Sequence, residues 1–284
     1  VCDTGSTDRT VEAATSLGCK VILGGDRMNK GACRNQAINA ANGEWVVILD
    51  CDEKIADPVG VRKFLSTTDA RTLFVRETYM NASDQGTLSF PQMRIWCRGD
   101  YLYKYRAHEV PMPCNGWKKS VTTDFVWEHR PDPSRGSWKT EYTFQRLEMD
   151  AAENPDDPRP QYYLGRQLRY KGEWQKAIDT LEKYLEMKGS ETDWDRANAC
   201  WDMAICYEKL GNKEMQRRWL HWAECEQPMN RQRYNELAAI YYDRKQFELA
   251  AGYCKLALEL PEKKEAGYHY PDLYRGTLWD KLAM

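Results

Sequence analysis

The sequence has no long apolar run and almost no net charge. Its 284 residues include 41 basic and 43 acidic side chains, a formal charge of -2 that gives no general attraction to nucleic acid or anionic lipid. No apolar stretch approaches the roughly 20 residues that span a bilayer, and the first residues carry no signal-peptide pattern. The length and the 42% apolar content nevertheless allow two buried cores. These properties predict a soluble protein without a membrane span.

Closely spaced cysteine pairs are also missing. The ten cysteines are scattered, and none forms the C-x-x-C spacing of zinc or redox sites. We therefore expect reduced, mostly buried thiols and a cytoplasmic location.

The first 130 residues alternate short β-rich runs with helical stretches. Residues 21–23 and 45–49 are continuous apolar runs, which are typical of strands covered on both faces in a parallel sheet. A helix is expected from about residue 31 to 41, and an earlier one from residues 6–8 to Gly18. This alternation predicts an α/β domain.

The middle of the chain contains two breaks. Residues 72–79 and 93–96 favour further strands, and residues 138–152 have a helical pattern. Proline-rich stretches at residues 131–133 and 154–160 flank that helix. The predicted organisation is therefore an α/β domain at residues 1–135, a linker and connecting helix at residues 136–157, and a helical region at residues 158–284.

Beyond residue 160 the sequence repeats itself with a helical period. Three segments share a pattern of small and large residues that is typical of tetratricopeptide units. The small residues let paired helices approach closely, and the large ones fill the groove of the neighbouring pair. The aligned positions are Leu164, Gly165, Leu168, Gly172, Ala177, Leu181 and Tyr184, then Met203, Ala204, Tyr207, Gly211, Leu220, Ala223 and Pro228, and then Leu237, Ala238, Tyr241, Ala250, Ala257 and Pro261.

The spacing of the three repeats is uneven. Gly165 and Ala204 are 39 positions apart, whereas Ala204 and Ala238 are 34 apart, so we expect one longer linker. Residues 278–282 are expected to cap the open end. The alternative is an irregular helical bundle.

An acidic motif follows the second apolar run. Asp50, Asp52 and Glu53, with Cys51 between the first two, come directly after residues 45–49. Open α/β folds bind ligands at such a sheet edge, where two carboxylates can share a hard cation with a diphosphate. Mg²⁺ or Mn²⁺ suits these oxygen ligands. The alternative is that the acidic pair only ends a strand.

Five segments of the first 130 residues occur in a recognisable order. They are residues 3–10 (DTGSTDRT), 31–35 (GACRN), 45–53 (WVVILDCDE), 106–109 (RAHE) and 128–129 (EH). In this order they resemble family 2 glycosyltransferases of the A-type, Rossmann-like nucleotide-sugar fold, in the bacterial branch that carries trailing repeats. The resemblance implies a nucleoside diphosphate sugar, for which UDP-sugar is expected, and a divalent metal.

The resemblance also implies a role for each matching residue. Asp3 would accept a hydrogen bond from the nucleotide base, Asp8 would support the same turn, and Arg34 would approach the base or the phosphates. Asp50 would face the ribose, and Asp52 would bind the metal. Alternatively, Asp8 only caps its helix, Arg34 lies on a solvated face, and Asp50 orients backbone amides.

His108 and Glu109 are the candidate catalytic residues. An inverting transfer needs a carboxylate that removes the acceptor proton during in-line attack at the anomeric carbon, and Glu109 is the candidate base. His129 would ligate the metal or contact the diphosphate. The alternatives are that His108 and Glu109 close a loop by hydrogen bonding and that His129 only packs.

Members of this family normally begin with a strand ahead of the first motif. The sequence, which begins at Val1, has no such strand. We therefore expect either a truncated fragment or another segment in its place.

Three functions remain in competition. The first is an inverting, metal-dependent glycosyltransferase whose repeats hold the acceptor, such as a peptide or protein. The second is a non-catalytic, repeat-based interaction protein with a degenerate glycosyltransferase domain, and the third is a nucleotide-binding regulator. The joint presence of Asp50, Asp52, Glu109 and His129 favours the first.

Overall fold

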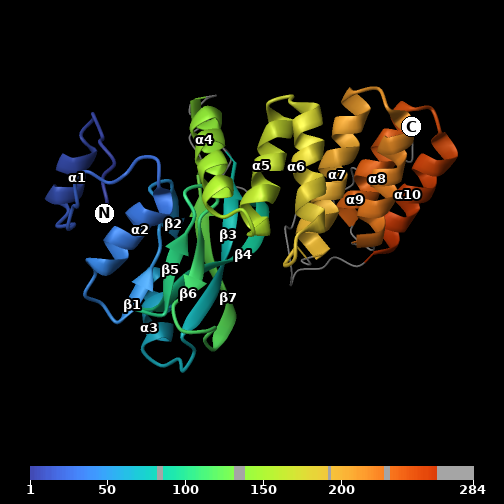
Figure 1. The fold of residues 1–284 in the computed structure, drawn as a ribbon. Helices are drawn as coiled ribbons and strands as arrows, with labels where there is room; N and C mark the ends of the chain where they lie inside the picture. The colour runs from blue at the N-terminus through green and yellow to red at the C-terminus, as the bar shows by residue number, and fades with distance from the viewer. Residues whose placement is uncertain (82–85, 131–137, 191–192, 227–230, 261–284) are drawn as a thin grey trace. The chain divides into compact units, whose positions relative to one another are not determined.

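The computed structural model describes residues 1–284 except 82–85, 131–137, 191–192, 227–230 and 261–284 (Figure 1). The chain folds into two compact units, each of which is made of segments from different parts of the sequence. The first comprises Val1–Glu44, Arg98–Gly116 and Ser134–Gln227, and the second comprises Trp45–Cys97, Trp117–Pro133 and Pro228–Met284. The predicted break at residues 131–133, the repeat positions Pro228 and Pro261, and the cap at residues 278–282 lie outside the described residues.

A mixed five-stranded sheet forms the centre of the second unit, in the order β1-β4-β3-β7-β2. Its strands are β1 (Trp45–Val47), β2 (Glu53–Ile55), β3 (Thr72–Met80), β4 (Gly86–Cys97) and β7 (Ser120–His129). Helix α3 (Pro58–Leu65) contributes Val61 to the core, which also contains Leu73, Ile95 and Trp127. The predicted strands at residues 72–79 and 93–96 are confirmed within β3 and β4.

The predicted parallel pairing of the two apolar runs is largely wrong. β1 lies at the sheet edge and pairs antiparallel with β4, and Val47 and Leu49 are exposed. In residues 21–23 only Ile22 forms a bridge, which is parallel and joins Cys2. An apolar run shows that a strand is partly covered, but it does not identify the partner strand.

The first unit begins with helices α1 (Thr10–Ser16) and α2 (Lys30–Asn39), close to the predicted ranges. It also contains a hairpin of β5 (Tyr101–Lys104) and β6 (Val110–Pro113). Asn35 of α2 donates to the Tyr103 carbonyl and accepts from its amide, at 2.9 and 2.7 Å. A Cβ at Gly31 would lie 2.4 Å from the Tyr105 carbonyl oxygen, so only glycine allows this close approach of α2 to the hairpin.

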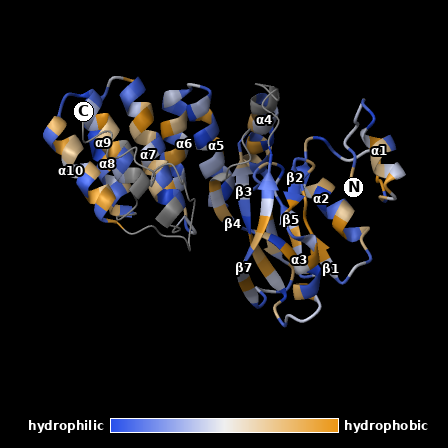
Figure 2. Cartoon of the chain, turned by 180° about the vertical axis from the view of Figure 1, so that it is seen from behind, coloured by the Kyte–Doolittle hydropathy of each residue, from blue (hydrophilic) through white to orange (hydrophobic). Residues whose placement is uncertain are grey.

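Five helices complete the first unit: α4 (Trp138–Glu153), α5 (Pro158–Tyr170), α6 (Trp174–Glu186), α7 (Asp193–Lys209) and α8 (Lys213–Glu226). Both hydrophobic and hydrophilic residues occur along each of these helices (Figure 2). The core of α5, α6 and α7 includes Tyr162, Ile178, Leu181 and Met203. In the part of the chain that the structure describes, no helix combines the length and apolar character needed to cross a membrane.

The helix pairs confirm the predicted repeat pattern. α5 and α6 form the first pair and α7 and α8 the second, and α9 (Arg231–Asp243) and α10 (Phe247–Glu259) form a third within the second unit. A Cβ at Gly165 would lie 2.6 Å from Leu181, which explains the small residue at this position. α7 has 17 residues against 13 in α5, so a longer helix accounts for most of the wider first spacing.

All ten cysteines are free thiols, as the sequence predicts. Five are buried, namely Cys33, Cys97, Cys200, Cys206 and Cys254, so the expectation of mostly buried thiols holds for only half of them. Cys51 is exposed and does not pack into a core.

Candidate functional site

The acidic motif forms the turn between β1 and β2. The Ile48 carbonyl accepts from the Trp127 indole at 3.0 Å, which anchors the segment before the turn. The Asp52 carbonyl accepts from the Arg130 amide at 2.8 Å, which anchors its end beside β7. Glu53 is the first residue of β2, and its buried carboxylate accepts from the Asp50 amide at 2.8 Å. The turn therefore has a conformation fixed by the sheet.

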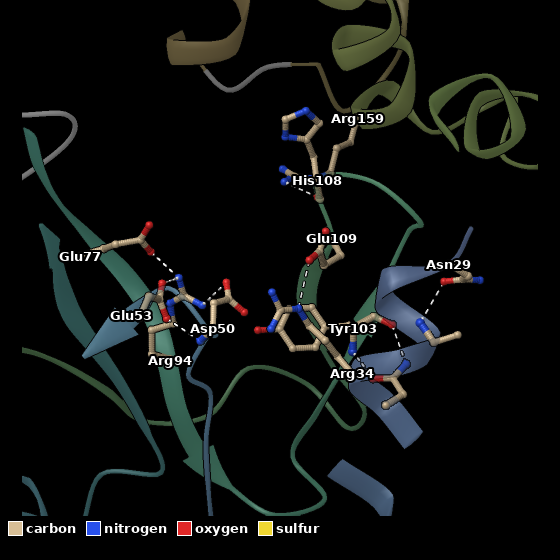
Figure 3. Close-up of polar contacts among 12 residues, drawn as sticks. Asn29, Arg34, Asp50, Glu53, Glu77, Arg94, Tyr103, His108, Glu109 and Arg159 are labelled. Atoms are coloured by element: carbon tan, nitrogen blue, oxygen red, sulfur yellow. Dashed lines mark hydrogen bonds and ion pairs between the residues drawn. The ribbon is translucent and has the colours of Figure 1, made fainter. Parts of the chain in front are cut away.

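Arg94 lies among the carboxylates of this unit (Figure 3). One of its terminal nitrogens, Nη2, lies 2.5 Å from both Glu53 Oε1 and Glu77 Oε2, and Nη1 lies 3.5 Å from Asp50 Oδ2. The sequence reasoning missed Glu77 and Arg94. The signal that was available is a charged residue beside apolar core residues within each strand, Glu77 in β3 and Arg94 in β4, since an unpaired buried charge is unfavourable.

Burial controls the ionisation of this acidic group. Desolvation raises the pKa of Glu53 to about 7, although Arg94 and the Asp50 amide oppose the shift. Desolvation also disfavours the charged form of Arg94, but Glu77, Glu53 and Asp50 outweigh it and raise its pKa. Arg94 thus stands beside the carboxyl groups of Asp50, Glu53 and Glu77, and a further cation here would favour the charged form of Glu53.

His129 completes a candidate metal site with Glu53 and Glu77. One ligand atom from each of the three residues lies within 4.8 Å of the others. His129 Nδ1 is buried without a hydrogen-bond partner, 3.8 Å from Asp52 Oδ1 and 3.9 Å from Glu53 Oε1. The β-sheet register causes this proximity, because His129 of β7 stands opposite Glu53 in β2 and Tyr79 in β3. Carboxylate oxygens with one imidazole nitrogen fit a divalent ion such as Mn²⁺.

Glu109 and Arg34 form an ion pair in the first unit. Arg34 Nε donates to Glu109 Oε1 at 3.0 Å, and the Glu109 side chain is only 10% exposed (Figure 3). The Arg34 guanidinium also lies over the Tyr103 ring, 5.2 Å from its centroid. The alternative of a solvated face for Arg34 is therefore wrong, and its side chain instead orients the candidate base.

His108 adopts an unusual backbone conformation and packs on a helix. Its φ is 49°, in the left-handed region. Its ring stacks on Tyr163 at 4.0 Å, and its carbonyl accepts from Arg159 Nη2 at 3.0 Å. Desolvation lowers the pKa of His108 to about 4, and Arg159 and Arg166 lower it further, although the residue as a whole is exposed to water. His108 is thus neutral at pH 7, and its ring covers one face of the Tyr163 ring.

Asp3 and Asp8 both bond within their own turn. The Asp3 carboxylate accepts from the Gly5 and Ser6 amides and from the Ser6 hydroxyl, and these bonds lower its pKa. Asp8 accepts from the hydroxyl and amide of Thr10, at 2.5 and 3.0 Å, where α1 begins. The hydroxyl bond is the main cause of the lowered Asp8 pKa. Asp8 thus bonds the amide of the first residue of α1, whereas the N-cap residue of this helix is Arg9, which makes no side-chain capping bond.

The predicted site residues fall into two groups. Asp3, Asp8, Arg34, His108 and Glu109 belong to the first unit, which brings Arg34 and Glu109 into contact. Asp50, Asp52 and His129 belong to the second unit, which brings Asp52 and His129 close together.

An open pocket of about 720 Å³ lies in the first unit beside the segment that carries Glu109. The hairpin contributes Lys104, Tyr105, Val110 and Met112 to its lining. The junction of α4 and α5 contributes residues 153–159. Val110 directly follows Glu109 in the sequence, but Glu109 itself is not a lining residue, and its side chain pairs with Arg34 of α2.

Comparison with known proteins supports the interpretation of a two-part chain. Residues 1–116 match the profile of the family described as "Glycosyl transferase family 2". A "TPR repeat-containing protein" of Synechococcus elongatus is 47% identical over 55 residues, which are 19% of this chain and 14% of that protein. The chain thus resembles family 2 glycosyltransferases in its amino-terminal part and carries tetratricopeptide-like repeats, as the sequence predicts.

Two solved structures align with parts of the chain. The "Crystal structure of MamA" is 21% identical with a TM-score of 0.37, and the alignment covers 44% of this chain and 70% of that one. PilW, titled a "widely conserved type IV pilus biogenesis factor", is 19% identical with a TM-score of 0.41, and the alignment covers 50% and 63% of the two chains.

Proposed function

We propose that this chain, whose residues 1–116 match glycosyl transferase family 2, transfers a sugar from a nucleoside diphosphate to an acceptor with inversion. The family match supports glycosyltransferase activity in general terms. The observation that carries the proposal further is the acidic group of the second unit, where His129 Nδ1 lacks a partner beside an excess of carboxylates. Such a group suits a metal-dependent donor site.

Four residues would hold the divalent ion: Asp52, Glu53, Glu77 and His129. When bound, the cation would stabilise the charge of the leaving diphosphate. Mn²⁺ suits the imidazole nitrogen better than Mg²⁺, although both suit the carboxylates. Arg94 limits the repulsion among these carboxylates and keeps them together without the ion.

Glu109 is the proposed general base. Its carboxylate would take the proton of the acceptor nucleophile while that atom bonds to the anomeric carbon and the bond to the diphosphate breaks. Arg34 donates to one carboxylate oxygen at 3.0 Å, and in this proposal Glu109 takes the acceptor proton on the other. His108, being neutral at pH 7, is assigned to the shape of the loop and not to proton transfer.

The acceptor is proposed to enter the pocket beside Glu109. In this proposal residues 1–135 carry the reaction, residues 136–157 connect, and residues 158–284 hold a peptide or protein acceptor, since helical repeats commonly bind extended peptides. UDP as the donor nucleotide, the contacts of Asp3, Asp8 and Asp50 with it, and the cytoplasmic location all stay predictions.

A donor panel tests the proposal. The full chain would be incubated with UDP-, GDP- and dTDP-sugars, each with Mn²⁺, with Mg²⁺ or with EDTA, and release of the nucleoside diphosphate would be measured. We expect release from one donor class that EDTA and Asp52→Ala abolish. Asp124→Ala is the matched control, because Asp124 is a highly exposed carboxylate of the same unit. Absence of release from every donor would contradict a transferase.

A non-catalytic interaction protein is the second candidate. Arg94 pairs with three of the carboxylates, so the acidic group is also stable as a purely structural element. Calorimetry with UDP and Mn²⁺ distinguishes the candidates, since a non-catalytic interaction protein would bind neither UDP nor Mn²⁺. A nucleotide-binding regulator would instead bind both without releasing sugar.

A further inference from the structure

The segment that carries His108 and Glu109 has a backbone that needs support. It connects β5 to β6, and both Tyr105 and His108 have positive φ angles, of 74° and 49°. Residues with a Cβ rarely adopt this conformation, which persists only where surrounding contacts impose it. The contacts that impose it come from α4 and α5 and from α2, whose Lys30 amide donates to the Arg106 carbonyl at 3.4 Å, all in the same unit.

Asp150, near the end of α4, bonds directly to the backbone of this segment. Its side chain is only 2% exposed. Oδ2 accepts from the amides of Arg106 and Ala107, at 2.8 and 3.2 Å, and Oδ1 accepts from the Arg106 guanidinium at 3.1 Å. One buried carboxylate thus binds two successive amides just before His108.

Asp157 and the first turn of α5 hold both ends of the segment. Asp157 Oδ2 accepts from Lys104 Nζ and from the Tyr105 hydroxyl, both at 2.6 Å, while Oδ1 accepts from the Arg159 amide and caps α5. Arg159 in turn donates to the His108 carbonyl. Capping of α5 and support of the loop therefore depend on the same carboxylate.

We propose that the α4–α5 junction positions the loop between β5 and β6, and that Asp150 is the main positioning residue for Glu109. The role of Glu109 in catalysis rests on the proposed function. Asp150 does not touch the reacting atoms. It fixes the amides of Arg106 and Ala107, and thereby the direction in which the chain presents Glu109 after His108. The junction lies outside residues 1–116, so the segment that matches the glycosyltransferase family holds the loop through α2 but does not contain Asp150.

Two measurements on Asp150→Ala in the full chain test this inference. Hydrogen exchange should show lost protection of the Arg106 and Ala107 amides, because their acceptor is removed. In transfer assays kcat should fall at least tenfold while the donor KM stays within about twofold, since misplacement by about 1 Å costs up to roughly 10²-fold.

Two further variants separate positioning from general stability. Asp150→Asn keeps one acceptor oxygen, so it should recover most of the amide protection and of kcat. Glu141→Ala removes another α4 carboxylate, which pairs with Lys171 of the helical region and does not contact the loop, and both readouts should remain unchanged.

The outcomes are distinct. Unchanged exchange in Asp150→Ala, or lost protection with normal kcat, overturns the positioning role. An equal fall of kcat in Glu141→Ala also overturns it, because the effect would then be general. If the wild-type chain transfers no sugar, the proposed function fails, and the exchange result alone decides whether Asp150 holds the loop.

Discussion

The two candidate catalytic groups are held in place in different ways. The acidic group around Arg94 projects from strands whose registers are fixed by the hydrogen bonds of one sheet. Glu109 instead follows a loop with two left-handed residues, which side chains of α4 and α5 hold. A change in the first group therefore affects the folding of its unit, whereas a change in the second alters geometry locally.

The two groups also differ in charge balance. Around Arg94 several carboxylates compete for one guanidinium, and an excess of negative charge remains. Glu109 has a single close cationic partner, Arg34. The excess suits a metal ion, whereas the balanced pair suits an oriented base. The predictions below test this contrast.

The largest effect is expected from Arg94→Met. Removal of the guanidinium leaves Glu53 and Glu77 buried without their cation, which typically destabilises a protein by about 3–5 kcal/mol. Urea denaturation, followed by circular dichroism, measures the free energy of unfolding.

Arg76→Met is the matched control for Arg94. Arg76 also belongs to the sheet, but its partner Asp124 is exposed, so a loss below about 1 kcal/mol is expected. Equal effects of the two substitutions would show that the buried acidic group does not stabilise the sheet.

Local patterns in the sequence identified a large part of this architecture. Helices α4 to α10 and their pairing follow from apolar periodicity and from small residues such as Gly165 and Ala177. Asp52 and His129 were assigned to one metal site, which stays a prediction, and the strand register places them 3.8 Å apart.

Long-range contacts were beyond this kind of prediction. Arg94 meets Glu53 across 41 positions, and Asp150 meets Arg106 across 44. A charged residue in an apolar strand, or an aspartate near a helix end, indicates that a partner exists but does not identify it. The antiparallel pairing of β1 was missed for the same reason, since the apolar run at residues 45–49 does not specify β4 as its neighbour.

Glu109→Gln should have the next largest effect. The amide keeps an oxygen for Arg34 but cannot take a proton, so transfer should fall by roughly 10²-fold or more while donor affinity is kept. Stopped-time assays give kcat, and calorimetry with the donor nucleotide gives the affinity. Near-normal turnover would exclude Glu109 as the base, and a joint loss of affinity would make it a ligand or a structural group.

His129→Gln should weaken Mn²⁺ binding by about tenfold or more, because it removes the nitrogen ligand that lacks a partner in the protein. Mn²⁺ titration followed by calorimetry measures this. His221→Gln is the control, since His221 is an exposed histidine beside Glu224 in α8 and should leave the affinity unchanged. An equal effect of both substitutions would place the metal elsewhere.

The smallest effect concerns the pH dependence of the loop around His108. An unperturbed histidine titrates near pH 6.5, whereas the folded chain lowers the pKa of His108 to about 4. Between these values the unfolded chain binds a proton that the folded chain does not, so the stability contributed by His108 is lost as the pH falls through this window. His108→Gln removes this dependence. The difference between the Tm of the wild type and that of the variant should therefore decrease as the pH is lowered from about 7.5 to about 5. The decrease should be at most about 2 °C, because the residue stays in contact with water. Scanning calorimetry measures both Tm values.

A Tm difference that does not change with pH would show that His108 titrates alike in the folded and unfolded chains. Its stacking on Tyr163 would then not shield the ring from water.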